Sequence, residues 1–177
     1  YWNSFKDVRI AASLDAMGSR GELIRAGTDW GVIEDNRRRM IEECPDVYFE
    51  ITPTVSIMNV YHLPDFHKDW IDRGLLEPQN VRMNILTYPT EYRIQIIPPT
   101  ERKKFIDKYT EHIKWIDDNF GDGAAKRGFE SVLDFLQQEN YENLVPDFID
   151  RNTPLDKLRG ESLYQVAPEL KFFRDYE

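Results

Sequence analysis

The sequence predicts a mixed α/β chain in which strands and helices alternate. Strand-like runs at 8–14, 47–60 and 81–86 are each followed by a stretch with helical spacing. Connections of this length are typical of parallel strands joined by helical crossovers. Three such units are too few for a closed barrel. They fit either half of a barrel or an open sheet with helices on both faces.

The first unit begins with an apolar run at 8–14, which suits a strand covered on both faces. A loop with two glycines follows before Arg25. The segment WGVIEDNRRRMIEE at 30–43 then places apolar side chains near one helical face. Thr28 or Asp29 is positioned to cap this helix.

The second unit contains the run VYFEITPTVSIMNV at 47–60, which is rich in β-favouring residues. Pro53 marks a bulge in this strand or its end. The segment LPDFHKDWIDRG at 63–74 carries apolar and aromatic side chains at helical spacing, with Pro64 near its start and Gly74 at its end. We expect a short helix there.

The third unit has two strand-like runs, VRMNIL at 81–86 and YRIQII at 92–97, separated by TYPTE. They predict a hairpin or one long strand broken at Pro89, and we favour two strands. The segments 100–120 and 125–138 follow, and their apolar side chains recur on one helical face. Both are expected to be amphipathic helices.

Composition excludes several classes of function. The chain has 23 Lys and Arg against 32 Asp and Glu, and its formal net charge of -9 repels a nucleic-acid backbone. No apolar stretch approaches the ~20 residues that cross a bilayer, and no basic and apolar leader opens the sequence. We therefore expect a cytoplasmic protein without a membrane or nucleic-acid partner. Because the sequence begins with Tyr1 rather than Met, we expect it to be a fragment.

Polar side chains collect where the predicted strands end. Ser13 and Asp15 follow the first strand, and Thr52 and Thr54 follow in the second. Four more polar residues occupy such positions: Ser56, Asn59, Asn84 and Thr87. In parallel α/β architectures, the carboxyl ends of the strands form the ligand-binding edge. The sequence therefore predicts a site for a polar ligand there.

Two interpretations of this edge are open. In the functional one, Ser13 donates a hydrogen bond to a ligand, and Arg25 pairs bidentately with a ligand carboxylate. In the structural one, Asp15 begins a turn, Ser13 bonds to its neighbours and Arg25 forms a surface salt bridge.

Metal and triad chemistry have little support in the sequence. His62 and His67 are five residues apart, which is not one helical face, and His112 is on another predicted element. No glycine-flanked serine elbow occurs. The single cysteine, Cys44, cannot form an internal disulfide or a cysteine-only cluster site, and we expect a plain buried or half-buried thiol at a helix end.

Four stretches carry a resemblance to a known family. They are SLDAMGSRGELIRAG, ITPTVSIMNVYHLPDF, VRMNILTYPTEYRIQIIP and LDKLRGESLYQVAPEL, which together span nearly the whole chain. In order and spacing they resemble the twitch-domain-containing group of radical S-adenosylmethionine (SAM) enzymes. The family's Ser-x-Asp-Gly element reads SLDAMG here, with Ala16 at the glycine position.

The resemblance implies a fold and a chemistry. Residues 1–120 would form the second half of a (β/α)6 barrel of the TIM type, and residues 121–177 a C-terminal helical extension. A 4Fe-4S cluster would be held by an upstream Cys-x-x-x-Cys-x-x-Cys loop, so this chain alone is not competent. In such enzymes the cluster reductively cleaves SAM to methionine and a 5'-deoxyadenosyl radical, which abstracts a substrate hydrogen. A reductant protein and an unknown substrate, such as a peptide or a sugar derivative, would be the partners.

The resemblance also implies a SAM pocket. Our candidates for cofactor binding are Ser13, Asp15, Arg25, Thr52, Thr54 and Leu86. Ser13 would contact the ribose or the methionyl group, and Arg25 the carboxylate of SAM. Thr52 or Thr54 would face the ribose, and Leu86 would lie near the adenine.

Two other functions are open at this point. The first is a non-catalytic interaction module whose tail, Ala124 to Glu177, docks a partner. Its ending, LKFFRDYE, suits an exposed docking segment as well as packed core. The second is a different barrel enzyme that uses the same strand ends for a sugar or an organic phosphate.

Overall fold

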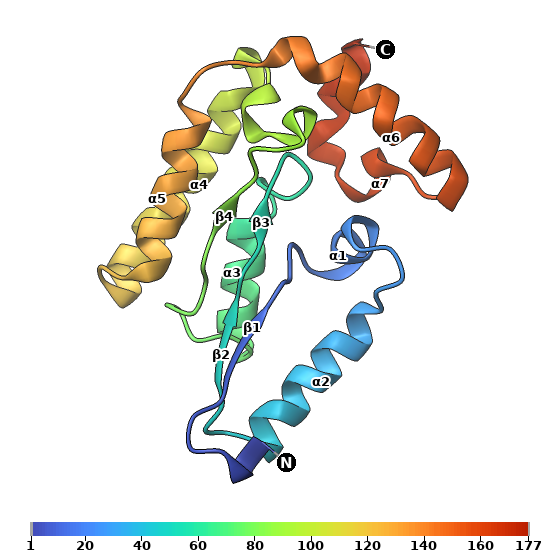
Figure 1. Cartoon of the computed structure of the whole chain (residues 1–177). Coiled ribbons are helices and arrows are strands. Elements are labelled where there is room, and N and C mark those ends of the chain that lie inside the picture. Colours follow the sequence, from blue (N-terminus) through green and yellow to red (C-terminus); the bar gives the residue numbers. More distant parts are fainter. Residues whose placement is uncertain (1, 177) are drawn as a thin grey trace.

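The structure, a computed structural model, describes residues 2–176 and is a mixed α/β chain in which helices predominate (Figure 1). The strands are β1 (Arg9–Ala12), β2 (Tyr48–Ile51), β3 (Thr54–Val55) and β4 (Asn84–Ile85). The α-helices are α1 (Gly18–Ile24), α2 (Trp30–Glu43), α3 (Leu63–Asp72), α4 (Pro99–Phe120), α5 (Ala124–Leu136), α6 (Val145–Arg159) and α7 (Leu163–Val166). Shorter 3-10 helices are Trp2–Ser4, Thr90–Tyr92, Ile94–Ile96, Glu142–Leu144 and Pro168–Tyr176.

The strands pair in parallel, as their alternation with helices predicts. β1 pairs with β2, and β3 pairs with β4. A bridge between Ile51 and Val81 links the two pairs. Pro53 interrupts the middle strand between β2 and β3, and its carbonyl still accepts from the Asn84 amide at 3.0 Å. Three neighbouring parallel segments result, with β2 and β3 in the centre.

The predicted helices are present with nearly the expected bounds. Helix α2 covers 30–43, and Asp29 rather than Thr28 caps it, because Asp29 Oδ1 accepts from the Val32 amide at 3.1 Å. Helix α3 begins beside Pro64, and the chain leaves it at Gly74, where φ is 67°. Helices α4 and α5 take up the two amphipathic segments that follow.

The prediction of a loop between the first strand and Arg25 is wrong in part, because α1 forms there. Its packing depends on Gly21: a Cβ at this position would lie 2.7 Å from the Ala16 carbonyl oxygen and 3.1 Å from the Trp30 ring. Gly18 opens the helix with a φ of 58°. Two glycines that look like loop residues thus allow a short helix in a tight space.

The prediction of a strand at 92–97 is wrong, as are both the hairpin and the single long strand. Two 3-10 turns occupy this segment. The Gln95 carbonyl oxygen accepts from the Tyr141 amide at 3.0 Å and from Arg102 Nη2 at 2.8 Å, so its partner is not a neighbouring strand. A short apolar run suits a buried turn as well as a strand.

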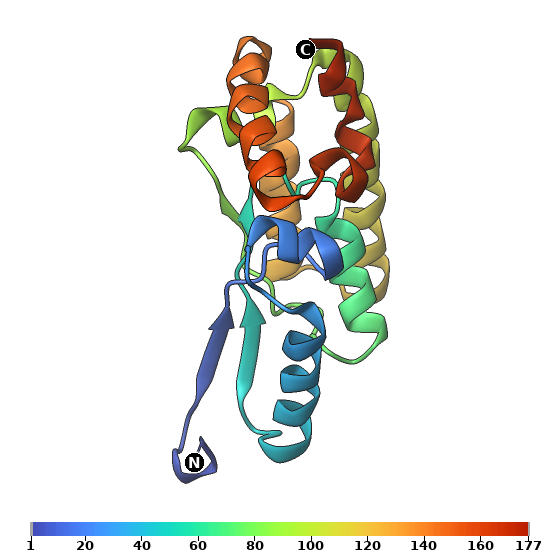
Figure 2. The same cartoon turned by 90° about the vertical axis from the view of Figure 1, so that its right-hand side faces the viewer.

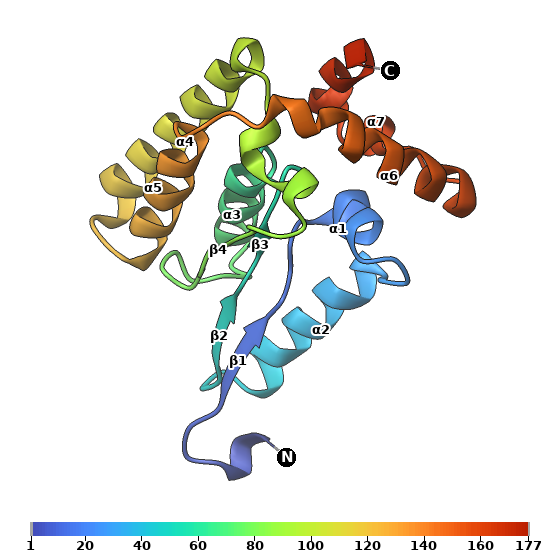
Figure 3. The same ribbon diagram turned by 45° about the horizontal axis from the view of Figure 1, so that its top comes forward.

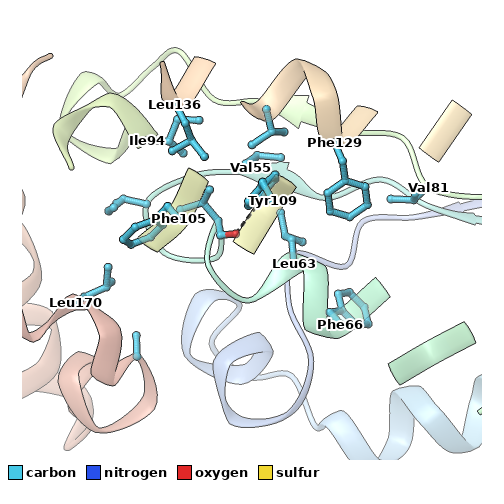
Figure 4. Packing of buried hydrophobic residues seen from close by; sticks show 14 of the residues in the cluster. Val55, Leu63, Phe66, Val81, Ile94, Phe105, Tyr109, Phe129, Leu136 and Leu170 are labelled. Atoms are coloured by element: carbon cyan, nitrogen blue, oxygen red, sulfur yellow. Dashed lines mark hydrogen bonds between the residues drawn. The ribbon is translucent and has the colours of Figure 1, made fainter. Parts of the chain in front are cut away.

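One face of the strands is packed against helices. Helices α2, α3 and α4 all lie on the same side of the strands in Figure 2. Ile51, Val55 and Val81 point to this side and are almost completely buried. Figure 4 shows the core around Tyr109, whose hydroxyl donates to the Val60 carbonyl oxygen at 2.8 Å.

The opposite face carries no covering helix among residues 2–176. Arg9, Ala11 and Ser13 are exposed on β1 and at its end, while the residues between them are half-buried. The expectation of a first strand covered on both faces is therefore wrong. Because side chains alternate along a strand, the small residues Ala11 and Ser13 both point to the uncovered face.

The C-terminal helices share the core of the strand region. Gly121, where we expect the helical extension to begin, lies in the turn between α4 and α5, which run side by side (Figure 1). The hydrophobic core continues through both helices. Leu170 and Phe173 of the ending LKFFRDYE are fully buried, so these two positions are packed core; Glu177 lies outside the described residues.

Candidate functional site

The carboxyl ends of the strands bring the predicted polar residues to one edge of the uncovered face. Ser13 follows β1, and Thr52 lies beside it, because the Thr52 amide donates to the Ala12 carbonyl oxygen at 2.8 Å. Thr54 stands directly opposite Asn84 on the next strand. Ser13 and Thr54 are exposed and Thr52 is half-buried. Helices α1 and α7 are in contact beyond this edge (Figure 3).

Asp15 and Arg25 form a salt bridge at this edge. Arg25 Nε donates to Asp15 Oδ2 at 2.7 Å, and the amide of Thr54 donates to Asp15 Oδ1, also at 2.7 Å. The Asp15 side chain is 7% exposed, whereas that of Arg25 is 44% exposed. Both carboxylate oxygens of Asp15 thus have protein partners, and its position suits holding Arg25 rather than contacting a ligand.

The Asn59 side chain connects the loop after β1 to Thr54 in β3 by hydrogen bonds. Its Nδ2 donates to the carbonyl oxygens of Asp15 at 2.8 Å and of Thr54 at 2.9 Å. Its Oδ1 accepts from the Ser56 amide at 2.8 Å. The Asn59 side chain is fully buried, and these three bonds satisfy its amide. Its place after a predicted strand was the only signal of it in the sequence.

Arg25 keeps donors that the chain does not use. Its guanidinium contacts Asp15 through Nε, and within residues 2–176 neither Nη1 nor Nη2 has a hydrogen-bond partner. These two nitrogens form the end of a planar fork that matches a carboxylate or a phosphate. The salt bridge of the structural interpretation therefore exists, and it uses only the Nε donor of Arg25.

The remaining candidates differ in what they offer. Ser13 Oγ makes no hydrogen bond within the described chain, so the bond to its neighbours that belongs to the structural interpretation is not formed. Thr52 Oγ1 lies 3.4 Å from the Ala12 carbonyl oxygen. Leu86 is half-buried just beyond β4, where its amide donates to the Val55 carbonyl oxygen at 2.9 Å. All three lie at the carboxyl ends of the parallel segments.

A buried ion pair joins α1 to the C-terminal segment, and we did not predict it from the sequence. Arg20 of α1 contacts both carboxylate oxygens of Glu169, at 2.5 and 3.0 Å, and the two side chains are 7% and 10% exposed. Arg20 Nη2 also donates to the Val166 carbonyl oxygen at 3.1 Å. The pair joins residues 149 positions apart and fixes the C-terminal segment to α1.

Two histidines meet among the helices, away from the strand ends. The Pro78 carbonyl oxygen can only accept, so His67 Nε2 donates to it, at 2.9 Å. His67 Nδ1 must then accept from His112 Nε2, at 3.0 Å. Burial lowers the pKa of His67 to about 4 and that of His112 to about 3. Both rings are therefore neutral and act as structural hydrogen-bond partners.

Residues 2–176 do not fit an iron–sulfur cluster of their own. Cys44 is a half-buried thiol at the C-terminal end of α2, as expected for it. Clusters of this kind need several thiolates, and no group of three or more His, Cys, Asp or Glu side chains in the described chain could hold a metal ion.

Comparison with known proteins found no matching family model, no matching curated protein and no matching solved structure. Among the helices of residues 2–176, none is long and apolar enough to span a membrane.

Proposed function

We propose that this chain is the carboxy-terminal part of a radical SAM enzyme of the twitch-domain-containing group. The observation that carries the proposal is the polar edge at the carboxyl ends of three parallel segments, where Asp15 holds Arg25 and leaves both Nη atoms unpaired. Such an edge suits the amino-acid end of SAM, because a planar guanidinium can bind its carboxylate bidentately. The four sequence stretches that resemble the family support the same function.

The uncovered face supports a partial (β/α)6 barrel. Parallel sheets are normally covered on both sides, and in a barrel the second side faces the interior. Here the helices cover one side of the strands, while small polar residues such as Ser13 and Thr54 occupy the other. In the proposed arrangement an upstream half of the barrel closes over this face.

Each residue of the edge has a role in the proposal. Arg25 binds the carboxylate of SAM through its Nη atoms, and Ser13 donates to the ribose or the methionyl group. Thr52 or Thr54 faces the ribose, and Leu86 provides an apolar contact for the adenine. Asp15 contributes by holding Arg25 and the Thr54 amide.

The cluster belongs to a different part of the proposed enzyme. An upstream Cys-x-x-x-Cys-x-x-Cys loop holds it, since Cys44 is the single cysteine here. SAM bound to such a cluster supplies a 5'-deoxyadenosyl radical for hydrogen abstraction. The described residues bind and orient SAM. The substrate is unknown, with peptides and sugar derivatives as candidates, and a reductant protein supplies the electron.

The direct test is production of 5'-deoxyadenosine. The full-length polypeptide is reconstituted anaerobically with iron and sulfide and given SAM and a strong reductant. We expect 5'-deoxyadenosine well above the level of a matched variant in which the cluster cysteines are replaced by alanine. Equal amounts from the two proteins would refute the catalytic proposal.

An organic phosphate is a second candidate ligand, because the two free Nη atoms of Arg25 also match a phosphate. Titration of the same full-length protein with inorganic phosphate and with SAM separates the two. Binding of SAM that phosphate does not compete away favours the radical SAM function. Tight phosphate binding without SAM binding favours a different barrel enzyme.

A further inference from the structure

The buried polar network beneath Arg25 is more elaborate than a single salt bridge requires. Asp15 uses one carboxylate oxygen for Arg25 Nε and the other for the Thr54 amide, both at 2.7 Å. Asn59 then bonds the Asp15 carbonyl oxygen from below, at 2.8 Å. The network fixes the backbone and the side chain of Asp15 at the same time.

The network spans both loops that form the edge. Asn59 Nδ2 bonds to Asp15 in the loop after β1 and to Thr54 in the second, and Asn59 Oδ1 accepts from Ser56. Asn59 and Asp15 are 0% and 6% exposed, so water does not compete for these bonds. The Asn59 side chain therefore joins the two loops, together with the bond from the Thr54 amide to Asp15.

The consequence of this network concerns Arg25, one of its exposed members. The Arg25 side chain is 44% exposed and carries four freely rotating torsions when it is unpaired. The bond at Nε restricts the guanidinium, and its two Nη atoms have no hydrogen-bond partner among the described residues. A ligand carboxylate then meets donors that are already in place, and less conformational entropy is lost on binding.

We propose that Asp15 and Asn59 are positioning residues that hold Arg25 ready for the carboxylate of an amino-acid ligand. The proposal rests on the proposed function, since the ligand there is SAM. Neither residue contacts the ligand. Asp15 acts through Arg25, and Asn59 acts through Asp15.

The test compares SAM with decarboxylated SAM, which lacks only the group that Arg25 binds. In the reconstituted full-length polypeptide we expect SAM to bind roughly 10-fold more tightly than the decarboxylated analogue. Asp15→Asn keeps an oxygen for the Thr54 amide but sets an amide donor against Arg25 Nε. We expect the preference to fall to about 2-fold, with the affinity for the analogue unchanged.

Two further variants complete the test: one is expected to have an intermediate preference for SAM, and the other is a control. Asn59→Ala is expected to lower the preference to an intermediate level, about 3-fold, because Asp15 keeps its other partners. The matched control is Glu50→Gln. Glu50 is a similarly buried carboxylate, 8% exposed, paired with the exposed Arg82 at 2.6 Å on the same face. It lies within β2 opposite Ala11, and its side-chain partners, Tyr48 and Arg82, do not belong to the network of Asp15 and Asn59, so the preference for SAM is expected to stay at its wild-type value.

A second readout requires no ligand. In the wild-type protein the Arg25 Nε proton is expected to exchange slowly with water by NMR, and in Asp15→Asn quickly. Slow exchange in a wild-type protein that fails to bind SAM would refute the proposed function and leave the positioning role supported. Fast exchange in the wild type, or an equal loss of affinity for both ligands in Asp15→Asn, would overturn the positioning role.

Discussion

The two faces of the strands differ in nearly every physical property. On the helix side, Ile51 and Val55 are 1% and 0% exposed and belong to the continuous core. On the other side, Ser13 and Thr54 are exposed and no helix of the described chain covers them. Parallel strands are usually buried on both sides. Packing against helices therefore stabilises this fold from one side of the strands only, within the described chain.

Polar groups follow the same division. Among the helices, His67 and His112 use each other and the Pro78 carbonyl oxygen, and burial keeps both rings neutral. On the uncovered face, Arg25 pairs with the buried carboxylate of Asp15, and its side chain is 44% exposed. Arg82 pairs with that of Glu50, and its side chain is 68% exposed. On the helix side, buried polar groups are thus partners of one another, whereas on the other side each arginine pairs with a carboxylate and also contacts solvent.

The largest expected difference between the faces is in core packing. Ile51→Ala removes a side chain that is 1% exposed in the middle strand, and we expect the free energy of unfolding to fall by about 2–5 kcal/mol. Thr52→Ala, the next residue on the opposite face, is expected to cost less than about 1 kcal/mol. Urea unfolding followed by circular dichroism measures both. Similar losses for the two variants would contradict a one-sided core.

The second largest expected effect is a loss of folding stability at low pH, caused by the histidines buried on the helix side. The pKa of His67 is lowered by burial from 6.5 to about 4, so the folded state resists a proton that the unfolded state accepts. Stability is complete above pH 6.5 and falls as the pH drops toward 4. Between pH 7 and pH 5 we expect a loss of about 2 kcal/mol per buried histidine.

The matched variant for this prediction is His112→Gln, whose amide can still donate to His67 Nδ1. Burial lowers the pKa of three histidines, His62, His67 and His112. The variant removes one of the three and is expected to reduce the loss between pH 7 and pH 5 by roughly a third. Urea unfolding at the two pH values provides the measurement. An identical loss in the variant and the wild type would place the acid sensitivity elsewhere in the protein.

Sequence pattern predicted the elements that depend on local chemistry. The period of α2 and the cap at Asp29 are both local, because a cap needs only an acceptor near the next free amides. The parallel pairing of β1 with β2 also followed, from the helical crossover between them. Where apolar residues occur without a clear period, as at 92–97, the same pattern suits a buried turn, and the structure has one.

The candidate site was predictable only in part. Ser13, Asp15 and Thr54 followed from their places at strand ends, and the structure brings them to one edge. The pairing of Asp15 with Arg25 was one of two open alternatives. The contact of Arg20 with Glu169 joins residues 149 positions apart, and no local pattern encodes a partner at that distance. Long-range polar contacts depend on the finished fold.

The smallest expected loss of stability is that of Glu50→Gln, and it tests whether a further part of the polypeptide covers the uncovered face. Glu50→Gln removes the charge from a carboxylate that bonds Arg82 at 2.6 Å. Since the Arg82 side chain is 68% exposed here, water replaces most of the lost interaction, and we expect a loss below about 1 kcal/mol in this chain. If a further part of the polypeptide covers this face, Arg82 loses its water, and the same substitution then costs about 3 kcal/mol.

Urea unfolding of the chain and of the full-length polypeptide, each with and without Glu50→Gln, measures the difference. Equal costs in the two proteins would mean that this end of the face remains in contact with solvent, which contradicts closure of a barrel over it.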